Sequence, residues 1–129
     1  MKIAIPVEMI SEDVKVCPSF GRAPYFLIYD TNTKVSEFIN NNGATITGGA
    51  GIKAAQKIVD NSVNALLAPR CGENAAEVIA SANIKIYKTL STSVKDNIDA
   101  FIDAKLPLLH EIHSGFHGHG EKSIWELLY

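Results

Sequence analysis

The sequence predicts an α/β domain built on a mixed five-stranded sheet with helices on both faces. Its 129 residues match the length of one domain. Before Gly48, short apolar runs rich in β-branched and aromatic residues indicate strands. After Gly48, apolar residues recur at helical spacing in segments that alternate with short apolar runs. Strands joined by helices pair in parallel through right-handed crossovers, and the helices then cover both faces of the sheet.

Three strands are expected before Gly48. Lys2–Val7 is a short apolar run typical of a buried strand, and Tyr25–Asp30 combines aromatic and β-branched residues. Residues 30–33 have the composition of a turn, so residues 34–39 are expected to form the third strand, paired with the second strand in a hairpin. The Asn-Asn-Asn-Gly cluster at residues 40–43 then ends this arm.

Three helices and two strands are expected in the rest of the domain. The strands cover residues 64–68 and 84–87, the second helix covers residues 74–82, and Ser93 caps the third helix. The apolar residues that recur at helical spacing, and are therefore expected to face inward, are Ile52, Ala55, Ile58, Val59, Ala75, Val78, Ile79, Ala82, Val94, Ile98, Phe101 and Ile102.

The composition excludes several classes of function. Lys and Arg number 12 against 14 Asp and Glu, so there is no basic excess for a nucleic-acid backbone. No apolar run approaches the roughly 20 residues needed to cross a bilayer. Two cysteines, Cys17 and Cys71, do not make a disulfide scaffold, so we expect free thiols in a reducing cytoplasm.

Three segments are expected to converge at one edge of the sheet, where open α/β sheets bind ligands. They cover residues 17–22, 47–52 and 70–74, and the last two begin helices. Helix N-termini, glycines that allow close approach, and the side chains of Arg22 and Arg70 together predict an anion site. The candidate binding residues are Ser19, Phe20, Gly21, Arg22, Gly48, Gly49, Ala50, Gly51, Cys71, Gly72 and Asn74.

Cys71 is a candidate metal ligand within this site. At a helix start beside Arg70 it is expected to carry more thiolate than a free cysteine, and thiolate suits iron–sulfur or copper centres. The alternative is a small buried residue with no ligand role, and the same alternative applies to Cys17.

The four histidines lie in a glycine-rich tail over residues 107–129. This composition predicts a mobile arm rather than a packed element. His110, His113, His117 and His119 are spaced so that they could close on a zinc, copper or nickel ion. A solvated arm that binds metal weakly is the alternative. The apolar end of the tail could dock on this domain or on a second subunit, so both a monomer and a homodimer remain open.

No catalytic constellation is found, so a binding module is favoured over an enzyme. The strands offer only Asp30 and Glu37 as carboxylates, and all histidines lie in the tail, away from Ser19. Residues 49–54 match a loose dinucleotide fingerprint, but they follow a hairpin and no phosphate-loop lysine follows the glycines. A nucleotide or phosphate ligand therefore remains an alternative.

Several motifs in order resemble the dinitrogenase iron–molybdenum cofactor biosynthesis family, which includes NifX, NafY and the C-terminal domain of NifB. The resemblance covers about residues 1–106 and leaves residues 107–129 as a separate His/Gly-rich tail. It rests on segments 3–7 (IAIPV), 19–26 (SFGRAPYF), 49–55 (GAGIKAA), 71–75 (CGENA) and 83–87 (NIKIY). Where the family often has proline, this chain has Glu73, which changes the local charge.

The resemblance implies a ribonuclease H-like three-layer α/β/α fold without nuclease activity. Its sheet has the strand order 3-2-1-4-5, with strand 2 antiparallel. It further implies that the chain binds or transiently carries an anionic metal–sulfur cluster, such as an iron–molybdenum cofactor precursor or a molybdenum–copper sulfide. Such a carrier has cluster donor and acceptor proteins as partners.

Overall fold

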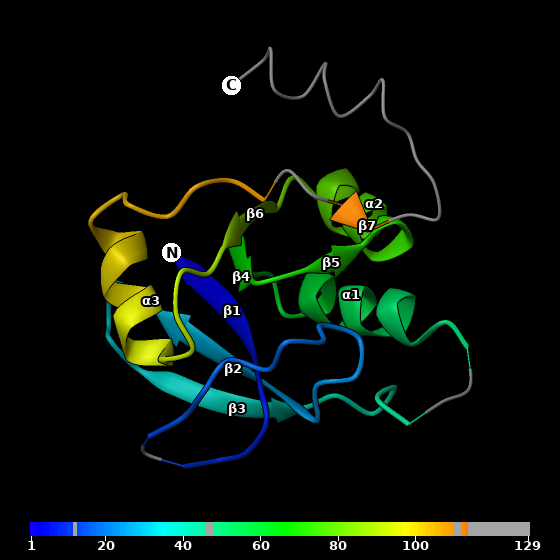
Figure 1. Cartoon of the computed structure of the whole chain (residues 1–129), viewed down its shortest axis with the longest axis horizontal. Helices are drawn as coiled ribbons and strands as arrows, with labels where there is room; N and C mark the ends of the chain where they lie inside the picture. The colour runs from blue at the N-terminus through cyan, green and yellow to red at the C-terminus, as the bar shows by residue number, and fades with distance from the viewer. Residues whose placement is uncertain (12, 46–47, 110–111, 114–129) are drawn as a thin grey trace.

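A computed structural model describes residues 1–11, 13–45, 48–109 and 112–113. A five-stranded sheet of order β3-β2-β1-β4-β6 lies at its centre (Figure 1). The strands of this sheet are β1 (Lys2–Val7), β2 (Tyr25–Asp30), β3 (Ser36–Asn40), β4 (Ala65–Ala68) and β6 (Lys85–Lys88). The helices are α1 (Ala50–Asp60), α2 (Glu73–Ser81) and α3 (Val94–Ile102), and a separate short pair is formed by β5 (Cys71–Gly72) and β7 (Ile112–His113).

The strand pairing confirms the predicted fold class. β2 runs antiparallel to both β1 and β3, while β1, β4 and β6 are parallel to one another. Because β6 is the fifth strand of this sheet, its order corresponds to the expected 3-2-1-4-5 with strand 2 antiparallel. The parallel strands are joined by helical crossovers, as the alternation of short apolar runs and helical segments indicated.

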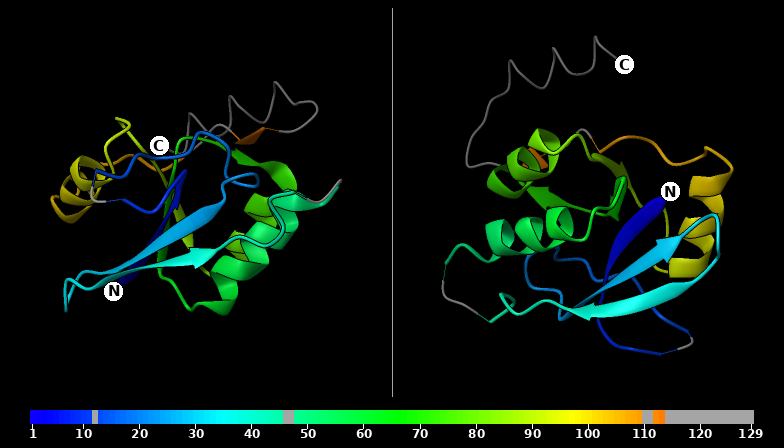
Figure 2. Two further views of the ribbon diagram at one scale, coloured as in Figure 1. Left: turned by 90° about the horizontal axis from the view of Figure 1, so that it is seen from below. Right: turned by 180° about the vertical axis from the view of Figure 1, so that it is seen from behind.

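Alternating side chains of the strands divide the core between the two faces of the sheet. Ala4 of β1 and Leu66 of β4 face α1 and α2, where they pack with Ile58 and Ile79. On the other face, residues such as Ile5 pack against α3. Figure 2 shows the resulting three layers, with α1 and α2 on one side of the sheet and α3 on the other. None of the helices in the described part of the chain is long and apolar enough to span a bilayer.

Some predicted details differ from the structure. β3 begins two residues later than expected, because Lys34 (φ 64°) still belongs to the turn and its N–H donates to the Asp30 carbonyl. Ile52 and Ile102 were expected to face inward but are 45% and 53% exposed. The Ser93 cap is confirmed, since its hydroxyl oxygen accepts a hydrogen bond from the Asp96 N–H at 3.2 Å.

Residues 107–109 and 112–113 pair with the domain, although the expected arm begins at residue 107, and residues 114–129 lie outside the described part of the chain. The Lys88 N–H donates to the Pro107 carbonyl and the Leu109 N–H to the Ile86 carbonyl, both at 2.8 Å. The Leu109 side chain is buried, and Ile112–His113 pairs in parallel with Cys71–Gly72. The physical reason is that the open edge of β6 needs hydrogen-bond partners, which residues 107–109 provide.

Candidate functional site

A cavity of about 590 Å³ lies where the chain leaves the carboxyl ends of β1 and β4. Its wall comes from three segments: the loop 18–21, the N-terminus of α1, and residues 70–75 at the start of α2. The lining residues are Pro18, Ser19, Phe20, Gly21, Gly49, Ala50, Gly51, Ile52, Arg70, Cys71, Gly72, Glu73, Asn74 and Ala75. The three segments expected from the sequence therefore meet at one place.

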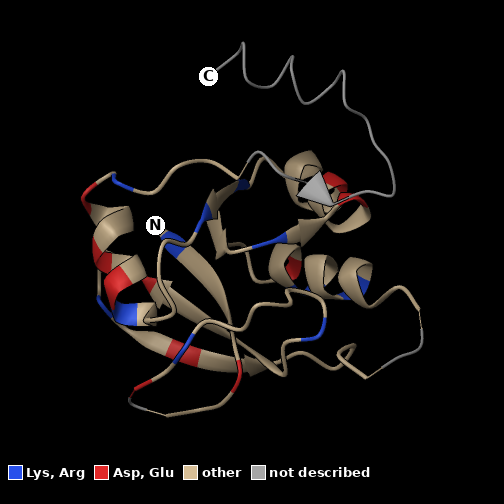
Figure 3. Cartoon of the chain, viewed as in Figure 1, with Lys and Arg blue, Asp and Glu red and all other residues tan. Residues whose placement is uncertain are grey.

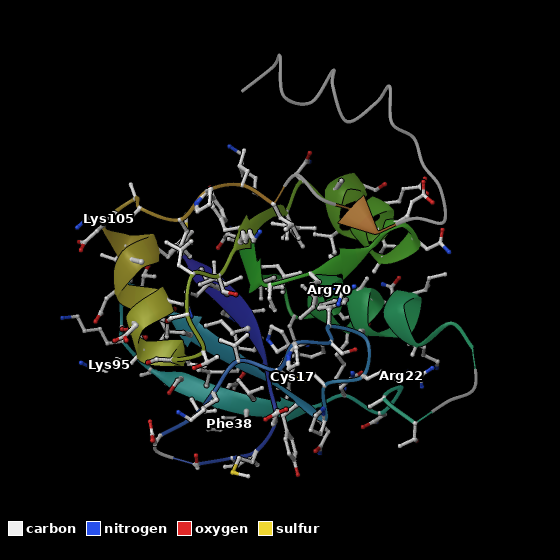
Figure 4. All side chains as sticks on the ribbon, in the orientation of Figure 1. Cys17, Arg22, Phe38, Arg70, Lys95 and Lys105 are labelled. Atoms are coloured by element: carbon white, nitrogen blue, oxygen red, sulfur yellow. The ribbon has the colours of Figure 1, made fainter. Side chains whose placement is uncertain are left out.

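All predicted binding residues except Arg22 and Gly48 line this cavity. The Arg22 guanidinium instead donates to the Ala44 carbonyl at 3.0 Å, which ties the site loop to the segment after β3. Arg70 lines the cavity, so it is the arginine that adds positive charge to the wall (Figure 4). Gly48 is exposed and lies outside the wall.

Both helix N-termini at the cavity lack a capping side chain. The N-cap of α1 is Gly49 in the left-handed conformation (φ 74°, ψ 15°), and the N-cap of α2 is Gly72 in an extended conformation. The Lys53 N–H donates to the Gly49 carbonyl at 3.0 Å, so the preceding N–H groups of α1 have no acceptor within the helix. These groups and the positive ends of the two helix dipoles favour negative charge in the cavity.

Glycines allow the three segments to approach closely. A Cβ added at Gly21 would lie 3.0 Å from both the Cα and the N of Gly51, so the site loop rests directly on the backbone of α1. A Cβ added at Gly51 would lie 3.5 Å from the Ala75 Cβ, which shows that the starts of α1 and α2 are neighbours. The sequence contains these glycines, but the contacts between them depend on the tertiary fold.

Asn41 is a positioning residue that sequence reasoning missed. Its side chain is 5% exposed, and its amide Nδ2 donates to the Gly21 carbonyl at 3.2 Å and to the Ala23 carbonyl at 2.8 Å. The Asn41 N–H donates to the Pro24 carbonyl at 2.9 Å. The asparagine cluster at residues 40–42 was interpreted only as a turn, because nothing in the local sequence indicates a partner about 20 residues away.

The expectation that Cys71 carries more thiolate than a free cysteine is wrong. Cys71 is 1% exposed, and burial raises the pKa of its thiol from 9.0 to about 11. Burial also raises the pKa of Cys17, whose Sγ donates to the Ser19 carbonyl at 3.5 Å. Both cysteines are free thiols within the core cluster beneath α1 and α2. Desolvation of the charged form therefore outweighs the helix start beside Cys71.

The predicted metal site in the tail lies almost entirely outside the described residues, as do His110, His117 and His119. The backbone of His113 is described, and it pairs with Gly72 at the wall of the cavity. Within residues 1–11, 13–45, 48–109 and 112–113, no group of three or more His, Cys, Asp or Glu side chains is placed to hold a metal ion.

The three-layer fold and the cavity between two helix N-termini define an α/β domain with a candidate ligand site at one edge of its sheet. A family model described as dinitrogenase iron-molybdenum cofactor matches residues 1–104, and the chain belongs to this family. The predicted family resemblance is thereby confirmed. The family is associated with biosynthesis of the iron–molybdenum cofactor.

Solved structures and a curated relative resemble most of the chain. The apo form of the orange protein from Desulfovibrio gigas is 30% identical, with a TM-score of 0.81 over 88% of this chain and 96% of that one. A Thermotoga protein assigned to NifB is 33% identical, with a TM-score of 0.76 over 89% and 98%. An uncharacterised protein of Methanocaldococcus jannaschii is 31% identical over 82% of this chain and 89% of its own length.

Replacing Gly21 by alanine is expected to destabilise the protein by about 1–3 kcal/mol, because the new Cβ meets backbone atoms that cannot move aside. Urea unfolding measures the change. Gly48→Ala is the matched control: its Cβ would meet nothing within 4 Å, so its effect should stay within about 0.5 kcal/mol. Equal effects of the two substitutions would show that Gly21 does not pack on α1.

Asn41→Ala is expected to lower the free energy of unfolding by about 1–3 kcal/mol, because two loop carbonyls lose their donor. Backbone NMR shifts of residues 19–24 should change with it. Asn42→Ala provides the control, since Asn42 is exposed. Unchanged loop shifts in the Asn41 variant would contradict a positioning role.

Cys71 is expected to react slowly with iodoacetamide at pH 8. A pKa of about 11 instead of 9.0 leaves about a hundredfold less thiolate, and burial slows access further. The rate is measured by mass spectrometry in a Cys17→Ala background, with the same chain unfolded in urea as the reference. Labelling at the rate of the unfolded chain would contradict a buried, neutral thiol.

Proposed function

We propose that the protein binds an anionic metal–sulfur cluster in this cavity and carries it without catalysing a reaction. The supporting observation is the composition of the wall, in which two uncapped helix N-termini and Arg70 surround about 590 Å³. Backbone N–H groups and a guanidinium group both favour a negatively charged guest. The volume falls in the range of small-molecule sites and exceeds what a single ion needs.

The wall also suits a soft guest with many acceptor atoms. Phe20, Ile52 and Ala75 give it apolar surface, while the glycines expose backbone that a bulky ligand can approach. A polynuclear sulfide is anionic, bulky and weakly hydrated, so it matches this combination better than a neutral metabolite does. Membership of a family associated with iron–molybdenum cofactor biosynthesis supports the same class of ligand.

Binding is proposed to be reversible docking. The N–H groups of α1 and α2 and the Arg70 guanidinium would hold the sulfides, and the neutral Cys71 thiol would give a direct metal bond only by losing its proton. A carrier of this kind exchanges its cargo with donor and acceptor proteins, and no covalent turnover is required. The tail histidines remain a predicted second metal site.

The direct test is anaerobic reconstitution of the purified protein with iron, sulfide and molybdate. A cluster absorption band that stays with the protein through gel filtration, together with a raised Tm, is the expected result. A panel of nucleotides is tested in parallel by the shift in Tm, because nucleotide binding is the alternative function. No absorption band, an unchanged Tm and a shift of several degrees with one nucleotide would replace this proposal by a nucleotide-binding function.

Arg70→Gln is expected to weaken binding of the reconstituted cluster by about 10- to 100-fold, because it removes a charge-assisted contact. Arg22→Gln is the matched control: Arg22 lies outside the wall and donates to Ala44, so cluster binding should change by less than about threefold. Binding is measured by anaerobic titration, and the Tm of each variant reports on its fold. Equal losses in the two variants would contradict a direct role for Arg70.

A further inference from the structure

The two helix N-termini at the cavity differ in charge. The first turn of α1 contains no acidic residue, whereas the first turn of α2 contains Glu73. Glu73 and Arg70 are the charged side chains among the residues that line the cavity, and both belong to the segment that leads into α2. The charges along the chain are shown in Figure 3.

This difference divides the wall into two parts. On one side, the first turn of α1 and the loop residues Ser19, Phe20 and Gly21 carry no acidic side chain, so the positive end of the α1 dipole is uncompensated. On the other side, Glu73 lies in the first turn of α2 and lines the cavity together with Arg70, and its negative charge offsets the α2 dipole. A uniformly negative ligand would be attracted by the first part and repelled by Glu73.

We propose that Glu73 orients the ligand: its sulfide-rich anionic end lies against α1, the loop 18–21 and Arg70, and a metal ion of the ligand faces the Glu73 carboxylate. Carboxylate oxygen is an ordinary ligand for divalent metal ions, so such an arrangement turns a repulsive contact into an attractive one. The cavity then selects a guest with an exposed metal ion at one end over a symmetrical thioanion. This inference rests on the proposed function and specifies the chemistry of its ligand.

Ile52 offers a way to place a negative charge on the α1 side of the wall. It lies in the first turn of α1, lines the cavity and is 45% exposed. Glutamate at the third position of a helix is favourable for the helix itself, so Ile52→Glu should fold. Its neutral partner is Ile52→Gln. For the α2 side, Glu73→Gln is paired with Glu77→Gln, since Glu77 is an exposed residue of the same helix outside the wall.

The probe is tetrathiomolybdate, titrated anaerobically at constant ionic strength into the full-length protein, with and without ferrous ion. For the probe alone, Glu73→Gln is expected to bind about three- to tenfold more tightly than the native chain. Glu77→Gln should change binding by less than twofold. Ile52→Glu should bind at least about tenfold more weakly than Ile52→Gln. Ferrous ion should strengthen binding in the native chain and have no such effect in Glu73→Gln.

The outcomes separate this inference from the proposed function. If the native chain binds the probe but Glu73→Gln behaves as Glu77→Gln does, the orientation by Glu73 is wrong and the cavity remains a thioanion site. If ferrous ion acts equally on the native chain and on Glu73→Gln, the metal-facing role is overturned. If no variant binds tetrathiomolybdate in either condition, the proposed function and the inference both fail.

Discussion

The direct contact between the backbones of Gly21 and Gly51 determines the shape of the candidate site. With 3.0 Å between a hypothetical Gly21 Cβ and the Gly51 backbone, the loop from β1 approaches α1 this closely because residue 21 lacks a side chain. Asn41 holds the same loop from behind through two carbonyl hydrogen bonds. The start of α2 then completes the wall, with Ala75 beside Gly51. The cavity is thus the space left between these three segments.

The fold was predictable because its signals are local. Apolar runs such as Lys2–Val7 predict strands, and the helical spacing after Gly48 predicts crossovers whose hand and direction are set by general rules. The site was predictable as a set of segments for the same reason, since loops after parallel strands leave one edge of the sheet. The directions of the side chains within these segments could not be predicted from the sequence. Arg22 ends one site segment and Arg70 begins another, and only the tertiary structure shows that Arg22 donates to Ala44 while Arg70 lines the cavity.

Burial explains the other differences between sequence and structure. The helix start beside Cys71 indicates a thiolate, but a side chain that is 1% exposed loses more from desolvation than it gains from the dipole. Ile52 fits the helical period yet stays 45% exposed, since it faces the cavity and not the sheet. The β5–β7 pairing involves two residues on each strand, which is too short for a periodic signal. Each of these features depends on neighbours that are distant in the sequence.

The three helices differ in whether a side chain caps their N-termini. α3, on the face of the sheet away from the cavity, has the Ser93 cap, and such a cap contributes about 1 kcal/mol. α1 and α2 have glycine N-caps with no side-chain hydrogen bond, and both begin in the wall of the cavity. At Gly72, whose backbone is extended, a serine or aspartate could accept hydrogen bonds from the first N–H groups of α2, whereas the positive φ of Gly49 favours glycine for its backbone alone. The missing cap at α2 therefore forgoes local stability and leaves its N–H donors for the proposed guest, which is the pattern expected where a binding role selects the residue.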